Sequence, residues 1–133
     1  MTKPSKTEST AENGRFAYNG LERVIHERAR LSIMTSLVAH PHGLLFSDLK
    51  DFCALTDGNL SRHIDVLKEA GLIEVWKGLK NNRPQTLCRL SDVGRQRFTE
   101  YINVLENVVS DAVNSEAAER AADKTITEGW SPV

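Results

Sequence analysis

The chain has 133 residues, of which 40% are hydrophobic, and its formal net charge is −1. This length and composition allow one domain with a real hydrophobic core. The near-zero charge gives no support to a nucleic-acid partner, and no stretch reaches the roughly 18 apolar residues of a membrane span.

The N-terminal residues 1–15 contain no apolar run, so we expect neither a signal peptide nor a membrane anchor there, and a cytoplasmic location. Residues 1–18 are expected to form a disordered tail. Asn19 and Glu22 then form a variant capping box that begins a long first helix, which ends before Pro41. Its buried stripe is predicted to comprise Leu21, Val24, Ile25, Leu31, Met34, Leu37 and Val38.

His26 and Arg30 share a face of this helix at i,i+4 spacing. They could bind a ligand or phosphate, but a solvated or intrahelical role is favoured. The link Leu44–Phe46 is short and apolar, and a third strand beside a hairpin is one interpretation of it. Ser47 is placed to cap the next helix, in which Leu49 and Phe52 face inward.

The stretch from Leu55 to Lys77 carries the strongest local signals. Thr56 is a candidate helix cap and Asp57 adds a favourable charge in the first turn. Gly71 is placed to end the helix, and the residues up to Trp76 form a strand. The gap from Cys53 to Thr56 fits the tight turn of a helix-turn-helix. Three apolar residues fall on one helix face, namely Leu60, Ile64 and Leu67.

The opposite face of this helix is polar and able to donate and accept hydrogen bonds. It comprises Asn59, Ser61, Arg62, Asp65 and Lys68. Such a face suits a helix in a DNA major groove. An amphipathic helix with a merely solvated face accounts for the same pattern equally well.

A hairpin follows the helix. The residues GLKNNRP predict a loop of several residues between two strands, the second of which runs from Thr86 to Leu90. The basic residues on or beside it outnumber a single acid, Glu74, and are well suited to phosphate contacts. They are Lys77, Lys80, Arg83 and Arg89.

Ser91 and Asp92 begin a last long helix. Its apolar stripe comprises Val93, Phe98, Tyr101, Ile102, Leu105, Val108 and Val109. The stripe is longer than a core of this size needs, so we expect Ile102, Leu105, Val108 and Val109 to form a dimer interface, although the helix could also fold back on the first one. Residues 19–110 would form the folded domain, and residues 111–133 an acidic tail that is partly helical or disordered.

These elements resemble the winged-helix transcriptional regulators, and within them the MarR-like and ArsR-like families of prokaryotes. The resemblance covers roughly residues 21–105. It is carried by FSDLKDFCALTDGNLSRHIDVLKEAGLIEV, by NNRPQTLCRLSDVGRQRF and by VIHERARLSIM. It implies a mainly α fold with a small β-hairpin, a winged helix-turn-helix with a long C-terminal helix. It also implies a set of DNA contacts, namely Thr56, Asn59, Ser61 and Arg62 on the helix and Lys77, Lys80 and Arg83 on the wing.

Signals for other chemistry are weak. Cys53 and Cys88 lack paired spacing and are expected to be buried filler. ArsR-like metal sensors carry ligand cysteines in the recognition region, and none occurs between Ala54 and Leu87. His40 and His42 have no evident third partner for a metal. Phosphate loops, nucleophile elbows and carboxylate pairs are missing from the sequence. We therefore expect no enzymatic activity, metal or cofactor.

The sequence thus predicts a homodimeric transcriptional regulator, a repressor, that binds specific double-stranded DNA. A winged helix that binds an acidic partner protein is the alternative from another class. A third reading is a regulator that responds to an unknown small-molecule effector, through a pocket between its first and last helices, or to oxidation of the Cys53 thiol.

Overall fold

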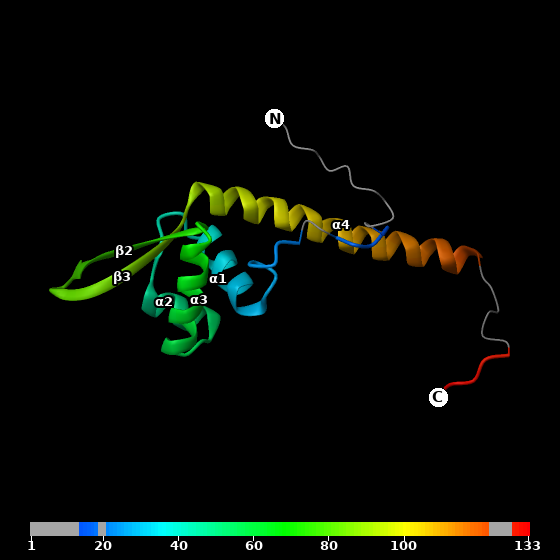
Figure 1. The fold of residues 1–133 in the computed structure, drawn as a ribbon, viewed down its shortest axis with the longest axis horizontal. Coiled ribbons are helices and arrows are strands. Elements are labelled where there is room, and N and C mark those ends of the chain that lie inside the picture. Colours follow the sequence, from blue (N-terminus) through cyan, green and yellow to red (C-terminus); the bar gives the residue numbers. More distant parts are fainter. Residues whose placement is uncertain (1–13, 19–20, 123–128) are drawn as a thin grey trace. The chain divides into compact units, whose positions relative to one another are not determined.

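A computed structural model describes residues 14–18, 21–122 and 129–133. The described residues form helices and strands in the order expected of a winged helix-turn-helix with a long last helix, which confirms the predicted fold (Figure 1). None of the described helices is long and apolar enough to cross a membrane. The elements are α1 (Arg28–Val38), β1 (Leu44–Leu45), α2 (Phe46–Cys53), α3 (Asp57–Glu69), β2 (Ile73–Lys80), β3 (Arg83–Leu90) and α4 (Asp92–Ala122).

The chain divides into two compact units. One is Asn19–Asn103, and the other comprises Met1–Tyr18 and Val104–Val133. In the second unit, the Tyr18 hydroxyl donates a hydrogen bond to Asp111 over 2.8 Å. Desolvation of the hydroxyl and this hydrogen bond both raise the pKa of Tyr18. Residues 14–18, the described part of the predicted N-terminal tail, thus include a contact with α4.

Helix α3 forms as its local signals predict. The Thr56 hydroxyl accepts a hydrogen bond from the Asn59 N–H over 3.2 Å and caps the helix. Gly71 adopts a φ of 78°, the left-handed conformation that ends many helices. The predicted apolar face is buried, since Leu60, Ile64 and Leu67 are 0%, 5% and 0% exposed. Sequence and structure therefore agree on where this helix begins, ends and packs.

Two predictions about α2 are wrong. The helix begins at Phe46, directly after β1, and Ser47 does not cap it because the N-cap residue is Leu45, which makes no side-chain cap. Leu49 is fully buried, but Phe52 is 59% exposed. The Phe52 ring stacks on His40 with 5.6 Å between centroids, which shields one side of it without burying it in the core.

The first helix is shorter than predicted. It begins at Arg28, because the Glu27 carboxylate accepts a hydrogen bond from the Arg30 N–H over 2.9 Å and caps the helix. This hydrogen bond lowers the pKa of Glu27. The proposed cap at Asn19 lies outside the described residues. Within α1, Met34 and Leu37 are buried as predicted, whereas the equally buried Ile33 was missed.

The three strands form an antiparallel sheet in the order β1-β3-β2. β1 pairs with β3 at Leu44↔Cys88, which confirms the third strand. The predicted loop of several residues is instead a two-residue turn, because Asn81 and Asn82 have φ values of 53° and 62°. Positive φ at both positions is the signature of a type I′ hairpin turn, which asparagine tolerates. Both strands therefore continue almost to the tip of the wing.

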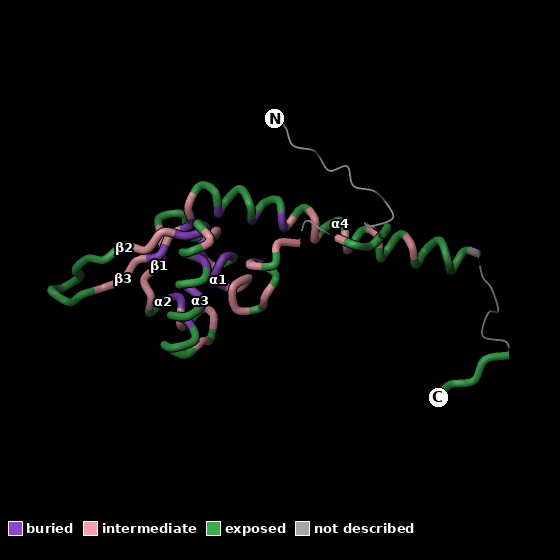
Figure 2. The backbone as a smooth tube through the Cα atoms, viewed as in Figure 1, coloured by how far each residue is buried: buried purple, intermediate pink, exposed green. Residues whose placement is uncertain are grey.

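The core of the first unit lies where α1, α3, the base of the sheet and the first turns of α4 meet (Figure 2). Ser91 caps α4 by accepting a hydrogen bond from the Gly94 N–H over 2.9 Å. Gly94 packs so closely on the residue before β2 that a Cβ atom there would overlap the Leu72 carbonyl oxygen. Phe98 and Tyr101 are buried as predicted, but Val93 is 48% exposed, so its assignment to the buried stripe is wrong.

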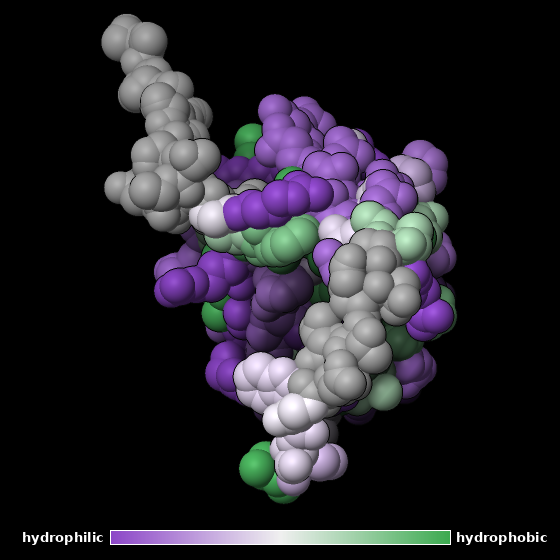
Figure 3. All heavy atoms as spheres, turned by 90° about the vertical axis from the view of Figure 1, so that its right-hand side faces the viewer, coloured by the Kyte–Doolittle hydropathy of each residue, from purple (hydrophilic) through white to green (hydrophobic). Residues whose placement is uncertain are grey.

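Elsewhere the surface is mixed. Figure 3 shows a face on which hydrophilic residues surround smaller apolar areas. Single exposed apolar side chains are normal on a soluble protein. Along α4, however, Val109 and Val113 are 60% and 59% exposed four residues apart, so they share one side of the helix.

Candidate nucleic-acid interface

All four predicted contact residues of α3 are exposed. Thr56 lies at the start of the helix, and Asn59, Ser61 and Arg62 lie in its first two turns. The Arg62 guanidinium donates a hydrogen bond to the Asn59 side-chain oxygen over 3.0 Å. This pairing leaves other donors of Arg62 free, since the guanidinium carries five N–H groups. The helix thus presents a donor-rich polar surface in its N-terminal half.

Contacts with both neighbouring helices hold α3, one at its surface and one at its buried side. Lys50 on α2 pairs with Asp57 in the first turn of α3, over 3.1 Å. On α1, Arg30 approaches the His63 Nδ1 to 3.2 Å and donates through its Nε to the Val24 carbonyl over 2.6 Å. These contacts hold the orientation of α3 and therefore the direction in which its exposed face points.

Arg30 therefore departs from the favoured prediction of a solvated or intrahelical role, whereas His26 is exposed, as that prediction allows. Arg30 links α1 to α3, and the His26 Nδ1 lies 2.7 Å from the Tyr101 hydroxyl on α4. His63, which is only 7% exposed, was missed altogether. A signal existed, because position 63 is three residues after Leu60 and falls on the buried side of the helix.

The environment of His63 predicts a pH dependence of stability. Burial lowers the pKa of His63, Arg62 and Arg30 lower it further, and Glu27 opposes them. The unfolded chain, in which the histidine has an ordinary pKa near 6.5, therefore binds the proton more readily. The neutral imidazole stabilises the fold fully above about pH 6.5, and this contribution is lost as the pH falls through that value towards the folded pKa.

Calorimetry at pH 7.5 and 5.5 checks this expectation. The melting temperature of the wild type should fall further on acidification than that of His63→Gln, which keeps a hydrogen-bonding group without the titration. The other histidines are common to both proteins and cancel in the comparison. Equal falls would contradict the assignment.

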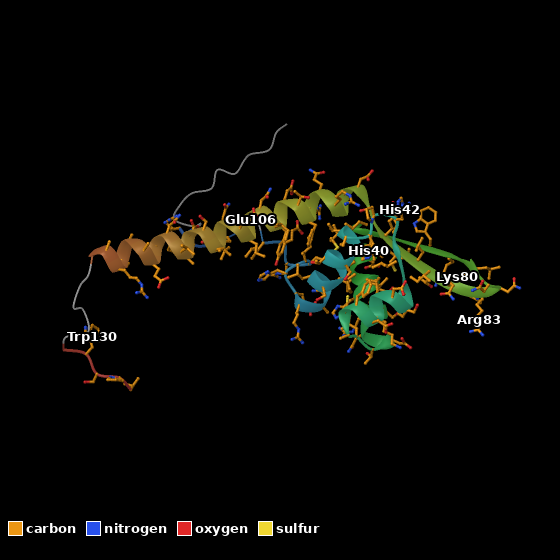
Figure 4. The ribbon with its side chains drawn as sticks, turned by 180° about the vertical axis from the view of Figure 1, so that it is seen from behind. His40, His42, Lys80, Arg83, Glu106 and Trp130 are labelled. Carbon is orange, nitrogen blue, oxygen red and sulfur yellow. The ribbon has the colours of Figure 1, made fainter. Side chains whose placement is uncertain are left out.

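The wing presents the second group of predicted residues. Lys77, Lys80 and Arg83 are all exposed. Lys80 and Arg83 lie on either side of the turn and are paired across the strands (Figure 4). The Lys77 ammonium donates a hydrogen bond to the Thr86 hydroxyl over 3.1 Å. Arg89 differs from them, because it forms an ion pair with Glu74 over 3.0 Å and is less available to a ligand.

The thiols and the remaining histidines do not join this interface. Burial raises the pKa of Cys88 to about 11. Burial also raises the pKa of the half-buried Cys53. His40 hydrogen-bonds the Ser36 carbonyl through its Nδ1 over 2.8 Å. In the part of the chain that the structure describes, no three His, Cys, Asp or Glu side chains are grouped as metal ligands. His40 and His42 are labelled in Figure 4.

Comparison with known proteins gives a family. A model described as winged helix DNA-binding domain matches residues 29–109. An uncharacterized protein of Methanocaldococcus jannaschii is 39% identical over 57 residues, which are 43% of this chain. The match spans 62% of the length of that relative.

Several solved structures share the fold. A transcriptional regulator homologue from Pyrococcus horikoshii is 28% identical, with a TM-score of 0.64, over 68% of this chain and 89% of that one. The S. aureus MepR–DNA complex has a TM-score of 0.61 and 16% identity, over 85% and 92% of the two chains. MarR has a TM-score of 0.62 and 19% identity, over 84% and 81%. The chain therefore belongs to the winged helix DNA-binding domain family, and its fold is that of MarR-like transcriptional regulators.

Proposed function

We propose that this protein represses transcription by binding specific double-stranded DNA as a homodimer. One observation carries the proposal. The exposed face of α3 presents Asn59 and Arg62, hydrogen-bonded to each other, on a helix that is capped and that contacts α1 and α2. A rigid helix with side chains of this kind is what reading of base edges requires. The related fold of S. aureus MepR was solved in complex with DNA, which supports the same use here.

In this proposal the helix and the wing have different tasks. Asn59, Ser61 and Arg62 read base edges in the major groove, where asparagine suits adenine and arginine suits guanine. Thr56, at the start of the helix, contacts the DNA backbone. Lys77, Lys80 and Arg83 contact phosphates, which add affinity but little sequence information.

Dimerisation is proposed through α4. Its residues Ile102, Leu105 and Val108 are only partly buried, and Val109 is exposed. Covering this stripe with a second copy would remove apolar surface from water. It would also supply two reading helices, which a palindromic operator matches.

A regulator controlled by a small molecule is the second candidate. A cavity of about 500 Å³ lies between α1, the turn from α2 to α3 and α3 itself, rather than between the first and last helices. Its lining includes Ser32, Asn59, Arg62 and His63. A ligand there would touch two of the proposed reading residues. Control by oxidation of Cys53 is less favoured, because a raised pKa leaves less of the reactive thiolate.

The proposal is tested first by selection of bound fragments from genomic DNA with the purified protein. A sequence-specific regulator enriches a common sequence, from which one specific duplex is made. A module that binds only proteins enriches nothing.

Substitutions in α3 and in the wing should then change DNA binding in different ways. Asn59→Ala or Arg62→Ala should cost about 1 to 3 kcal/mol in discrimination between the specific and a random duplex. Lys80→Ala or Arg83→Ala should weaken binding to both duplexes together and lower the salt slope by about one unit. Titrations at several salt concentrations separate the two patterns.

Lys68→Ala is a matched control for these titrations, because Lys68 is an exposed cation near the other end of α3. It should change neither the discrimination nor the salt slope. If Asn59→Ala and Arg62→Ala leave the discrimination between the specific and the random duplex intact, α3 is not the reading helix. The alternative that the protein binds a partner protein is then favoured.

A further inference from the structure

The face of the sheet that is turned away from the core carries an apolar row. Side chains alternate between the two faces of a sheet, and one row across the strands is Leu44, Cys88 and Val75, of which the first two are buried. The adjacent row therefore points outward. It comprises Leu45, Leu87 and Trp76. Trp76 is 51% exposed, so a large aromatic surface faces solvent at the base of the wing.

This row forms part of a groove along the outer face of the wing. The apolar end encloses about 250 Å³, and Gly78 has no side chain to fill it. A second depression shares Leu45, Lys80 and Gln85 with the first, so the two are continuous. We call the whole the wing groove, lined by Leu45, Trp76, Gly78 and Leu87 at its apolar end and by Lys80, Asn81, Arg83 and Gln85 at its polar end.

The aromatic side of the groove is held in place before any ligand arrives. The Trp76 indole N–H donates a hydrogen bond to Glu74 over 3.3 Å, and the Arg89 guanidinium lies 5.3 Å from the centre of the Trp76 ring. Arg89 also pairs with Glu74, as described above. A restrained, half-exposed tryptophan loses little freedom on binding, and tryptophan and arginine are enriched among the residues that dominate protein interfaces.

The charge at the other end of the groove is positive. Glu74 and Arg89 neutralise each other, so the net charge along the wing comes from Lys77, Lys80 and Arg83. No acidic residue is among those that line either depression. An anionic partner would therefore be attracted to the tip, while an apolar group would be attracted to the base.

We infer that the wing groove binds an extended acidic segment of a partner protein, with one apolar side chain against Trp76 and acidic residues beside Lys80 and Arg83. The apolar end measures about 250 Å³ and the cationic depression beside it about 540 Å³. Since the two differ in chemistry and follow one another along the strands, they suit an extended chain with one apolar anchor and acidic neighbours better than a compact metabolite. A DNA backbone would match the cations but has no apolar side chain for the other end. This interaction goes beyond the proposed repression of transcription, and it would compete with DNA for the wing tip.

A library of random 12-residue peptides displayed on phage tests the inference on the full-length chain. Selected peptides are counter-selected on Gly78→Glu, which places bulk and negative charge in the groove. This substitution is expected to fold, because a Cβ at Gly78 meets no atom within 4 Å. Enriched peptides should contain an apolar residue next to acidic residues.

One enriched peptide is then synthesised and titrated by fluorescence. The chain has two tryptophans, so a Trp130→Phe background makes Trp76 the sole reporter. Gly78→Glu in this background should weaken peptide binding at least tenfold. Lys80→Ala should weaken it less and reduce its salt dependence. Trp76→Ala, measured with a labelled peptide, should also lose at least tenfold.

Phe52→Ala is the matched control, since Phe52 is an aromatic residue on α2 with a similar exposed fraction, 59% against 51% for Trp76. It should leave peptide binding unchanged. The inference is overturned if no peptide is enriched over Gly78→Glu, if the enriched peptides carry no acidic residues, or if Trp76→Ala binds them as well as the wild type. It is also overturned if duplex DNA changes Trp76 fluorescence and the peptide does not, because the groove would then be a DNA contact.

Discussion

Gly94→Ala is expected to lower the free energy of unfolding by about 3 kcal/mol, the upper end of the usual cost of overpacking. In most helices alanine is better than glycine by up to roughly 1 kcal/mol. Here the added Cβ would overlap the Leu72 carbonyl oxygen and lie 2.8 Å from its carbonyl carbon. Backbone atoms cannot move aside by changing rotamer, so α4 and the segment that carries Leu72 would have to move apart. Denaturant titration measures the loss.

Gly58→Ala is the control for this substitution. Gly58 also lies in a helix, but a Cβ there would meet no atom within 4 Å. Its replacement should therefore raise stability by about 0.4 to 1 kcal/mol, through a smaller loss of backbone entropy on folding. Equal effects of the two substitutions would contradict the proposed role of Gly94.

The double substitution Leu105→Glu and Val109→Glu should convert a dimer into monomers and weaken binding to a palindromic operator by about 100-fold or more. The loss is large because a dimer gains effective concentration at its second half-site, which is worth roughly 10²–10⁴ in affinity. The charges would lie in the proposed apolar interface, where their desolvation is costly. Light scattering gives the mass, and titration with the selected duplex gives the affinity.

Val93→Glu provides the comparison, since Val93 is an exposed valine of α4 outside the proposed interface. It should remain dimeric and bind DNA normally. Circular dichroism checks that each variant is folded. A wild type that is monomeric at micromolar concentration would show the proposed interface to be wrong.

The parts of the fold that were predicted correctly depend on neighbours in the sequence. The cap at Thr56, the helix end at Gly71 and the buried face of α3 are all set by residues of one short segment, 56–71. The same holds for the start of α4 at Ser91. Capping and apolar periodicity act over such short ranges, so the ends and the buried face of these helices could be predicted from the sequence alone.

The errors have a different origin. Asn81, Asn82 and Pro84 suggested a loop, yet asparagine tolerates the positive φ that a two-residue turn needs. Pro84 lies beyond the part of β3 that pairs with β1, so β3 has a neighbour on only one side there, where proline is tolerated. Phe52 was expected to face inward from helical spacing alone, whereas in the structure its ring stacks on His40 at the surface.

The candidate site divides in the same way. The exposed residues of α3 could be predicted from the spacing of its apolar residues. That spacing defines the buried face of the helix, and the remaining positions then form the exposed face. The contact between Arg30 and His63 joins residues 33 positions apart, and no local sequence pattern predicts such a pair. The outward row at the base of the wing likewise required the register of three strands.

The tight turn at Asn81 and Asn82 has an electrostatic consequence for the wing. It sets a register in which Lys80 and Arg83 are directly opposite each other. Like charges in that position repel and weaken a hairpin. An anion bound between them would reverse the sign of this interaction, so occupation of the tip would also tighten the two strands. In the free protein, added salt should also stabilise the pairing of the two strands, because it screens the repulsion between Lys80 and Arg83.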